Sequence, residues 1–363
     1  FVVKIKIIMK VCILGDGLAS LTLALALAKL DINIDIYSTA QKKKSDKSRT
    51  LGISKSNVTF FNQNILNIDE LLWKIDKIEI YSESFENQKI LNFENDKKEL
   101  FSTIKNFELN NSLLSVIKKN NLIKFKKKIN NHHLDINAYK LIFNCDSNNL
   151  LTKKFFFNKI SKDYKSNAFT TIIKHQKILN NVASQVFTNK GPLAFLPISS
   201  RETSIVYSVK GNKSINFKDE IRKYNKKYIN YKLGKIQSFE LRSSILRSYY
   251  YKNILAFGDL LHKIHPLAGQ GFNMTIRDVK EILKIIKFRI NHGLDLDNSV
   301  CVDFEKKNKH KNYLFSNGID FIYEFFNSEN KIDSNILSKS VQLVGKNKMI
   351  NKIFTNYADK GFT

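Results

Sequence analysis

Residues 253–278 contain the residue types and spacings best suited to chemistry. The apolar run 254–257 predicts a short buried strand. Gly258 and Asp259 follow it and place a carboxylate at the strand's end, where a ligand could reach it. Pro266, Gly269 and Gly271 then predict a loop whose backbone a ligand can approach without obstruction by Cβ atoms.

A helix is predicted directly behind this loop. From Phe272, apolar residues recur at helical spacing as far as a cap at Gly293. The N-terminus of a helix offers free N–H groups and a partial positive charge. Strand, turn, loop and helix together predict a cradle for an anion or an electron-rich ligand.

Asp259, His262 and His265 stand three residues apart, a spacing that could suit metal ligands. Pro266 follows immediately, and no further carboxylate or cysteine lies nearby in the sequence. We therefore expect no metal here. Both histidines are expected to pack and to form loop hydrogen bonds.

A second glycine-rich turn lies near the N-terminus. Residues 10–14 and 32–37 predict two strands, and an Ala/Leu-rich helix to about Leu30 separates them. The turn between the first strand and the helix reads Gly15, Asp16, Gly17, Leu18, Ala19 and Ser20. This is the dinucleotide-binding fingerprint with Ser20 in place of the third glycine. The acidic residue expected at the second strand's end is missing, because Tyr37 and Ser38 stand there.

The run from Gly258 to Asn273 resembles the second flavin motif of the FAD-dependent aromatic hydroxylases, and is most similar to that of the ubiquinone-biosynthesis hydroxylases. It contains the pattern Gly-Asp-x-x-His-x-x-His-Pro-x-Ala-Gly-Gln-Gly-Phe-Asn. The resemblance extends over nearly the whole chain. It implies cofactor contacts by these residues: Gly15, Gly17, Leu18, Ala19, Ser20, Ser38, Arg49, Asp146, Gly258, Asp259, Pro266, Ala268, Gly269, Gln270, Gly271, Phe272 and Asn273.

Two of these residues stand outside the glycine motifs. Arg49 follows the second strand, as an arginine that helps to hold the flavin does in the family; a solvated loop arginine is the alternative. Asp146 ends the predicted strand 140–146 and resembles the family's Asp-Gly motif with Ser147 replacing glycine, or else it caps the strand. A family arginine that meets the cofactor phosphates is replaced here by Asn110 and Asn111.

Residues 168–209 alternate between apolar and polar types and predict an antiparallel sheet. Residues 191–197 are similar to the family's strand that runs toward the flavin ring. By that resemblance Phe195, Pro197 and His265 are predicted to contact substrate, although ordinary packing in the core is the alternative for each.

The resemblance implies an α/β fold of the para-hydroxybenzoate-hydroxylase type. A Rossmann-like FAD-binding domain of the glutathione-reductase type is interleaved with a mainly antiparallel substrate domain and followed by C-terminal helices. The predicted FAD segments are residues 9–77, 101–150 and 244–293. The substrate segments are residues 78–100 and 151–243, and the helical region is residues 294–363. Its Phe/Tyr stripes are expected to be core, with a surface toward lipid headgroups as the alternative.

The implied reaction is hydroxylation of the aromatic ring of a polyprenylated phenol in ubiquinone biosynthesis, with FAD as cofactor and with NAD(P)H and molecular oxygen as co-substrates. The resemblance implies a cytoplasmic protein at the inner membrane face, in contact with other ubiquinone-biosynthesis proteins. A reductase acting on a polyprenyl substrate and a non-catalytic scaffold of a quinone-synthesis complex remain alternatives. A halogenase is disfavoured, since Trp73 is the single tryptophan.

The formal net charge of +27 favours anionic membrane surfaces and anionic ligands. Seven of the 60 basic residues are arginines and the lysines are scattered, so no nucleic-acid partner is expected. Three widely spaced cysteines predict no disulfide framework and a reducing compartment. Glycines and Asp16 interrupt the apolar segment 4–30, so an export signal is not expected, and residues before Met9 are expected to add nothing to the fold.

Overall fold

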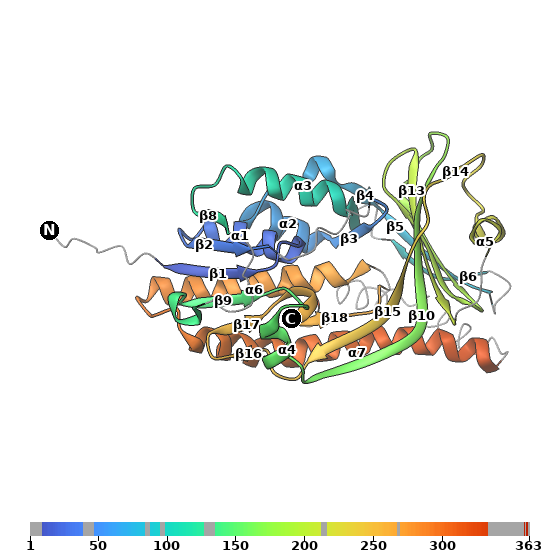
Figure 1. Ribbon diagram of the computed structural model, residues 1–363. Helices are drawn as coiled ribbons and strands as arrows, with labels where there is room; N and C mark the ends of the chain where they lie inside the picture. Colours follow the sequence, from blue (N-terminus) through green and yellow to red (C-terminus); the bar gives the residue numbers. More distant parts are fainter. Residues whose placement is uncertain are drawn as a thin grey trace.

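The computed structural model describes residues 9–38, 47–83, 88–94, 99–126, 135–211, 216–266, 269–332, 359 and 361. Residues 1–8 and Ala268 lie outside this part. A parallel sheet with its helices forms one end of the molecule and a large, mainly antiparallel sheet forms the other (Figure 1). The predicted α/β fold class is confirmed.

The first sheet is parallel except at one edge. Its strands, in sheet order, are β16 (Tyr250–Tyr251), β17 (Ile254–Ala256), β9 (Leu141–Asn144), β1 (Lys10–Leu14), β2 (Asn33–Tyr37) and β8 (Ile123–Lys126). Strands β9 and β17 are buried along their whole length, as their uninterrupted apolar runs predict. Helix α1 (Leu18–Ala28) is buried from Ser20 to Ala28, which explains its Ala/Leu-rich composition, and it packs between α3 (Asn106–Ile117) and α6 (Gly271–Asn291).

The second sheet is antiparallel except where β11 and β5 pair. Its strands, in sheet order, are β18 (His262–Lys263), β15 (Gln237–Leu246), β10 (Lys159–Lys174), β13 (Glu202–Lys210), β12 (Gly191–Pro197), β11 (Val182–Thr188), β5 (Lys77–Ser82) and β6 (Gln88–Glu94), and β14 (Lys232–Leu233) pairs with β10. We call the face that carries Val186 and Phe195 the outer face; α5 (Phe217–Tyr224) packs on it. The inner face carries Phe187, which packs with Met274 of α6.

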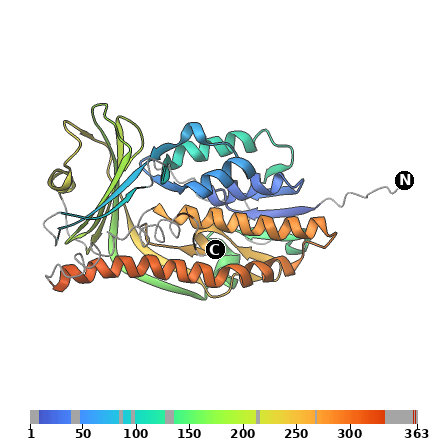
Figure 2. The same ribbon diagram turned by 180° about the vertical axis from the view of Figure 1, so that it is seen from behind.

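A third sheet joins the two larger ones. It pairs β3 (Thr50–Ser54), β7 (Phe101–Lys105) and β4 (Trp73–Ile75), and α2 (Lys55–Asn64) follows β3 directly. The remaining elements are η1 (Asp69–Leu71), η3 (Ile136–Ala138), α4 (Leu150–Phe155), η4 (Gly258–Leu260) and α7 (Asn298–Ile332). Helix α7 extends from the parallel sheet to the large sheet and so spans both ends of the molecule (Figure 2).

The helical region predicted for residues 294–363 is confirmed as α7 within the described residues, and its residues 333–358 lie outside them. Of its aromatic residues, Phe304 and Tyr323 are buried in the core, whereas Phe321 is 69% exposed. Helices α1 and α6 also lie where the sequence placed them, whereas α5 was not predicted. No described helix is long and apolar enough to cross a membrane.

Candidate functional site

The two glycine motifs lie directly against each other. Gly258 has φ +63°, and a Cβ atom built on it would lie 2.5 Å from the Cβ of Ala19. Because φ is positive and the neighbour is close, only glycine fits this position without strain. The turn after β17 therefore touches the start of α1, as expected if both motifs hold one ligand.

A third predicted segment meets them at the same edge. The register aligns Leu14, Asn144 and Ala256 as the last residues of β1, β9 and β17. Gly15 has φ +105°, and its added Cβ would lie 3.4 Å from the carbonyl carbon of Cys145, next to Asp146. From β1 the chain continues to β2 on one side of β1, whereas β9 lies on the other side. The carboxyl end of β1 is therefore a topological switch point of the sheet. Ligands of open α/β sheets bind at such points, beyond the carboxyl ends of the strands.

The space beside these turns suits a dinucleotide such as FAD. A Cβ atom added to Gly17 or Gly271 would meet no atom within 4 Å, so backbone faces open room there. Helices α1 and α6 begin at Gly17 and Gln270 without a side-chain cap, which leaves N–H groups free for a pyrophosphate. Asp259 is exposed next to them and could accept hydrogen bonds from ribityl hydroxyls. These residues fit FAD.

Buried polar atoms at the loop behind the turns support that fit. Within the described residues, Gln270 Oε1 and Thr50 Oγ1 are buried without a hydrogen-bond partner. Buried acceptors of this kind are rare in folded proteins unless a ligand or water satisfies them. Pro266, Gly269 and Phe272 flank them, and the Cβ position of Gly269 would lie 3.1 Å from the backbone nitrogen of Gly52. The loop therefore adjoins β3.

Asn273 was predicted to contact the cofactor, but its side chain is committed to the protein. Its Oδ1 accepts hydrogen bonds from Ser54 N at 2.9 Å and Asn57 Nδ2 at 2.9 Å, and its Nδ2 donates to the Gly52 carbonyl at 3.0 Å. The side chain is buried, so it joins the start of α6 to β3 and α2. Only the backbone of Asn273 remains available to a ligand.

The serines that replace family glycines fit their positions. Ser20 is fully buried, and its Oγ would lie 3.3 Å from a Cβ at Gly15, so the helix packs tightly against the turn. Ser147 is absent from the described non-glycine residues with positive φ, so the turn after Asp146 imposes no strain on it. Asp146 Oδ1 accepts a hydrogen bond from Asn148 N at 2.9 Å. Asp146 therefore caps the end of its strand, which is the alternative role that the sequence analysis gave it.

The missing acid of the second strand has a structural explanation. Asp35, the acidic residue within β2, is buried. Its carboxylate pairs with Lys10 at 2.9 Å and accepts a hydrogen bond from the Tyr139 hydroxyl at 2.8 Å. Tyr37 bonds the same Tyr139 hydroxyl at 3.0 Å, and Ser38 follows, half-buried. The carboxylate therefore serves the protein, and Ser38 is left at the strand's end.

Arg49 lies just before β3 with its side chain exposed. Its carbonyl accepts a hydrogen bond from Asn106 N, the first residue of α3, at 3.0 Å. An exposed guanidinium is compatible with both predictions for Arg49, a contact with the flavin and a solvated loop arginine. Asn111 is also exposed on α3, so neither position carries a buried group toward the glycine turns.

His262 forms a buried ion pair with Asp278. Burial works to lower the pKa of His262, but the charge and hydrogen bond of Asp278 outweigh it and raise that pKa above its ordinary value. Asn308 and Asn312 of α7 donate to the other oxygen of Asp278 at 3.4 and 3.2 Å. The pair therefore fastens the segment after Asp259 to both long helices.

His265 lies between two tyrosine rings, with centroids 4.8 Å from Tyr164 and 4.4 Å from Tyr323. Burial, with a smaller contribution from Lys162, lowers the pKa of His265 to about 4, so its ring is neutral near pH 7. This position fits packing better than the predicted substrate contact. Among the described residues, no group of three or more His, Cys, Asp or Glu side chains could hold a metal ion.

Phe195 does not face the glycine turns. It pairs with Ser184 across the strands and packs on the outer face with Val186 and the residues of α5. Its neighbour Ala194 pairs with Gln185 and so shares the inner face with Phe187. Pro197 ends the same strand, where its carbonyl accepts a hydrogen bond from Thr103. Phe195 therefore packs in the core of the outer face, which is the alternative given for it above, and it points away from the glycine turns.

A buried apolar cluster that the sequence did not identify lies on the inner face, and we call it the apolar wall. Phe187, Ile80 and Ile90 of the sheet pack there with Met274 of α6 and Ile319 of α7. Met274 follows the glycine loop by only three residues, so this wall begins where the loop ends.

Comparison with known proteins is consistent with this site. Residues 213–293 match the model of a protein family described as "FAD binding domain", and they include the whole Gly258–Asn273 motif. The chain is 21% identical over 273 residues to the mitochondrial ubiquinone biosynthesis monooxygenase COQ6 of Schizosaccharomyces pombe, covering 61% of this chain and 57% of that relative. It is 26% identical over 155 residues to the 3-demethoxyubiquinol 3-hydroxylase of Escherichia coli, covering 40% and 39%.

Thus the chain spans between about two fifths and three fifths of the lengths of these two relatives. Among solved structures, p-nitrophenol 4-monooxygenase PnpA of Pseudomonas putida superposes with a TM-score of 0.78 at 12% identity, covering 98% of this chain and 99% of PnpA. HpxO of Klebsiella pneumoniae, complexed with FAD and uric acid, gives 0.74 at 11% identity, covering 98% and 97%. The comparisons confirm FAD as the predicted cofactor, and they show that parts of the chain are similar to hydroxylases of ubiquinone biosynthesis.

Proposed function

We propose that this chain is an FAD-dependent monooxygenase that hydroxylates the aromatic ring of a polyprenylated phenol in ubiquinone biosynthesis, with NAD(P)H and O2 as co-substrates. The observation that carries the proposal is the contact between the two glycine motifs, where Gly258 meets Ala19 beside open room at Gly17 and Gly271. The names of the relatives in yeast and Escherichia coli support the substrate class.

The chain's own residues bind and orient in this proposal. The free N–H groups at the start of α1 hold the pyrophosphate, and Asp259 accepts from the ribityl chain. The loop from Gly269 to Gly271, fixed to β3 through Asn273, positions the ring system. When bound, FAD supplies the redox and oxygen chemistry, so the protein contributes placement, electrostatics and exclusion of water.

The apolar wall suits the ring and the first prenyl unit of such a substrate. Phe187, Met274 and Ile319 are each less than 10% exposed and come from three different elements. Each Å² of the substrate's own apolar surface that leaves water beside this cluster contributes roughly 25 cal/mol, so a prenylated ring would gain affinity that a small polar acid would not. A substrate with a long polyprenyl tail implies that the protein meets the membrane surface peripherally, on the cytoplasmic side.

The test combines flavin binding with product analysis. Purified protein is loaded with FAD, and NADPH and NADH oxidation is followed with and without a short-chain prenylated phenol. The proposal expects stoichiometric flavin, faster oxidation with the phenol, and a product that gains one oxygen atom from isotopically labelled O2. Folded protein that takes up no FAD would contradict it and favour the scaffold of a quinone-synthesis complex. Oxidation that reduces the prenyl chain without adding oxygen would favour a reductase.

A further inference from the structure

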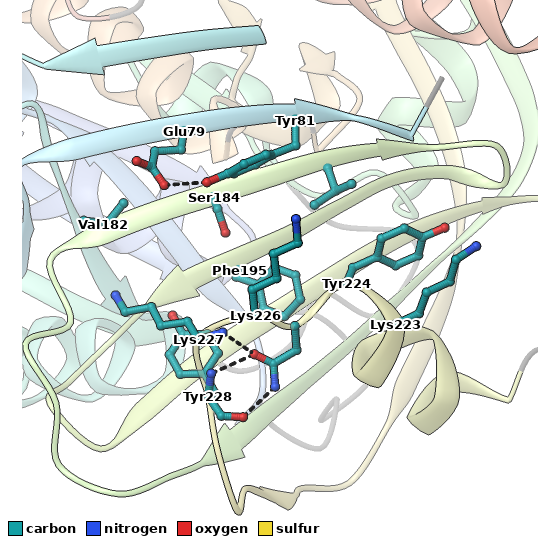
Figure 3. A pocket seen from close by; sticks show the side chains of 12 residues that line it. Glu79, Tyr81, Val182, Ser184, Phe195, Lys223, Tyr224, Lys226, Lys227 and Tyr228 are labelled. Carbon is teal, nitrogen blue, oxygen red and sulfur yellow. Dashed lines mark hydrogen bonds between the residues drawn. The ribbon is translucent and has the colours of Figure 1, made fainter. Parts of the chain in front are cut away.

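A recess opens on the outer face of the large sheet, on the side away from the glycine turns. Strands β5, β11 and β12 form its base, and residues 223–227, at the end of α5 and beyond it, form its rim (Figure 3). The cavity volume of the recess is about 100 Å³, and its mouth is open to solvent, so it suits one aromatic ring whose substituent reaches out of the mouth. Nothing in the proposed reaction uses it.

Aromatic side chains form the floor and walls of the recess. Phe195 and Tyr228 are buried at its base, with ring centroids 6.1 Å apart and planes within 28° of parallel. Tyr81 of β5 and Tyr224 of α5 stand on opposite sides (Figure 3). Aromatic rings spaced in this way favour a planar ligand, because stacked and edge-on contacts add to the burial of its apolar surface.

The charges in the recess are unbalanced. Lys223 donates to Glu83 at 2.7 Å, and Glu79 is already held by Lys89 at 2.6 Å and the Tyr81 hydroxyl at 2.8 Å. These five groups are therefore paired within the protein.

Lys226 and Lys227 are different. Neither forms an ion pair with a carboxylate in the described part of the chain; Lys226 Nζ lies 6.0 Å from the centre of the Tyr81 ring, and Lys227 Nζ lies 5.7 Å from that of Tyr228. Partial burial lowers the pKa of Lys227, and the charge of Glu79 offsets only part of that effect. Two cations above aromatic walls would both gain from an anion.

We propose that this recess is a second binding site, for a small aromatic anion whose ring lies between Tyr81 and Phe195 and whose acidic group meets Lys226 and Lys227. An aromatic carboxylic acid and an aromatic phosphate such as a nucleotide share this chemistry. The site is separate from the proposed FAD site because Phe195 and the inner-face residue Ala194 point to opposite faces of one strand.

The chain contains a natural reporter for this site. Its single tryptophan, Trp73, donates from Nε1 to the backbone carbonyl of Asn180 at 2.5 Å. The side chain of Asn180 accepts hydrogen bonds from Lys227 at 3.3 Å and from the Tyr228 hydroxyl at 3.1 Å. A ligand that draws Lys227 toward itself therefore disturbs the partner of the indole, and the tryptophan fluorescence should change.

The experiment titrates FAD-loaded protein with benzoate and, separately, with adenosine monophosphate, using calorimetry and tryptophan fluorescence. Benzamide, which has the ring without the charge, tests whether binding needs the charge. Acetate, which has the charge without the ring, tests whether binding needs the ring. The proposal expects saturable binding of at least one aromatic anion with a Kd of about 1 mM at low salt, since a ligand of this size rarely binds much more tightly without further contacts. Benzoate alone would assign aromatic acids, and adenosine monophosphate alone would assign nucleotides.

Variants locate the binding. The double variant Lys226→Gln/Lys227→Gln should lower the affinity for the anion at least about tenfold. Lys218 is an exposed lysine of α5 outside the recess, so Lys218→Gln should leave that affinity unchanged. No saturable binding, equal binding by the double variant, or binding only when FAD is absent would overturn the proposal. Since the recess lies away from the glycine turns, a preparation that takes up no FAD can still bind the probe, so the two proposals fail separately.

Discussion

A methyl group added at Gly258 tests whether the two glycine motifs really touch. In Gly258→Ala the new Cβ would lie 2.5 Å from the Cβ of Ala19, which cannot rotate away because it is fixed to helix α1. The left-handed backbone at φ +63° costs an alanine about 1–2 kcal/mol, and overpacking adds about 1–3 kcal/mol. We therefore expect flavin-free protein to lose about 2–5 kcal/mol of unfolding free energy in chemical denaturation.

Gly17→Ala is the matched variant, and we expect it to lower FAD affinity while it leaves stability nearly unchanged. Its backbone, at φ −80° and ψ 178°, suits alanine, and the added Cβ meets nothing within 4 Å. Stability should fall by less than about 1 kcal/mol, the cost of alanine at a helix start. The methyl enters the room assigned to the pyrophosphate, so FAD affinity should fall at least about tenfold in a fluorescence titration. Unchanged stability of Gly258→Ala, or unchanged FAD affinity of Gly17→Ala, would refute the geometry argued here.

Three further changes probe the supports of the site. Asn273→Leu leaves buried backbone groups unpaired and should lower the free energy of unfolding by about 2–4 kcal/mol. Asn111→Leu, at an exposed position of α3, should lower it by less than about 0.5 kcal/mol. His262→Gln should destabilise the protein by about 3–5 kcal/mol at pH near 5, because Asp278 loses its charged partner. Since the folded-state pKa of His262 is raised, that difference is full below its unfolded pKa of about 6.5 and shrinks as pH rises through the folded value; a difference that grows with pH would contradict the ion pair. The imidazole NMR signal of His265, identified by its loss in His265→Phe, should titrate near pH 4, and a midpoint near 6.5 would contradict its burial.

The cofactor cradle could be anticipated because its signals are local. A glycine between a strand and a helix reflects the backbone angles of that turn, and Gly15, Gly258 and Gly293 all have positive φ. Apolar runs and helical spacing likewise report on neighbours a few residues away, so β1, α1, β17 and α6 lie where they were predicted. The glycine turns then met because parallel strands end at one edge of a sheet.

The errors at the site have a different origin. Phe195 was assigned to the substrate, yet it faces α5, because a strand's alternation separates two faces without saying which of them meets the cofactor. Asn273 was assigned to the cofactor, yet its amide is bonded to Ser54, 219 residues earlier in the chain. No local pattern identifies a partner at that distance.

The sequence by itself determined where the turns, strands and helices lie and which of them carry the flavin motifs, since those properties depend on backbone geometry within a few residues. The tertiary structure alone decided what each side chain does. It turned His262 toward Asp278, committed Asn273 to β3, and placed Lys226 and Lys227 over a second, aromatic recess. Those roles depend on which surfaces the fold brings together, and contacts between distant segments are set by the packing of the whole chain.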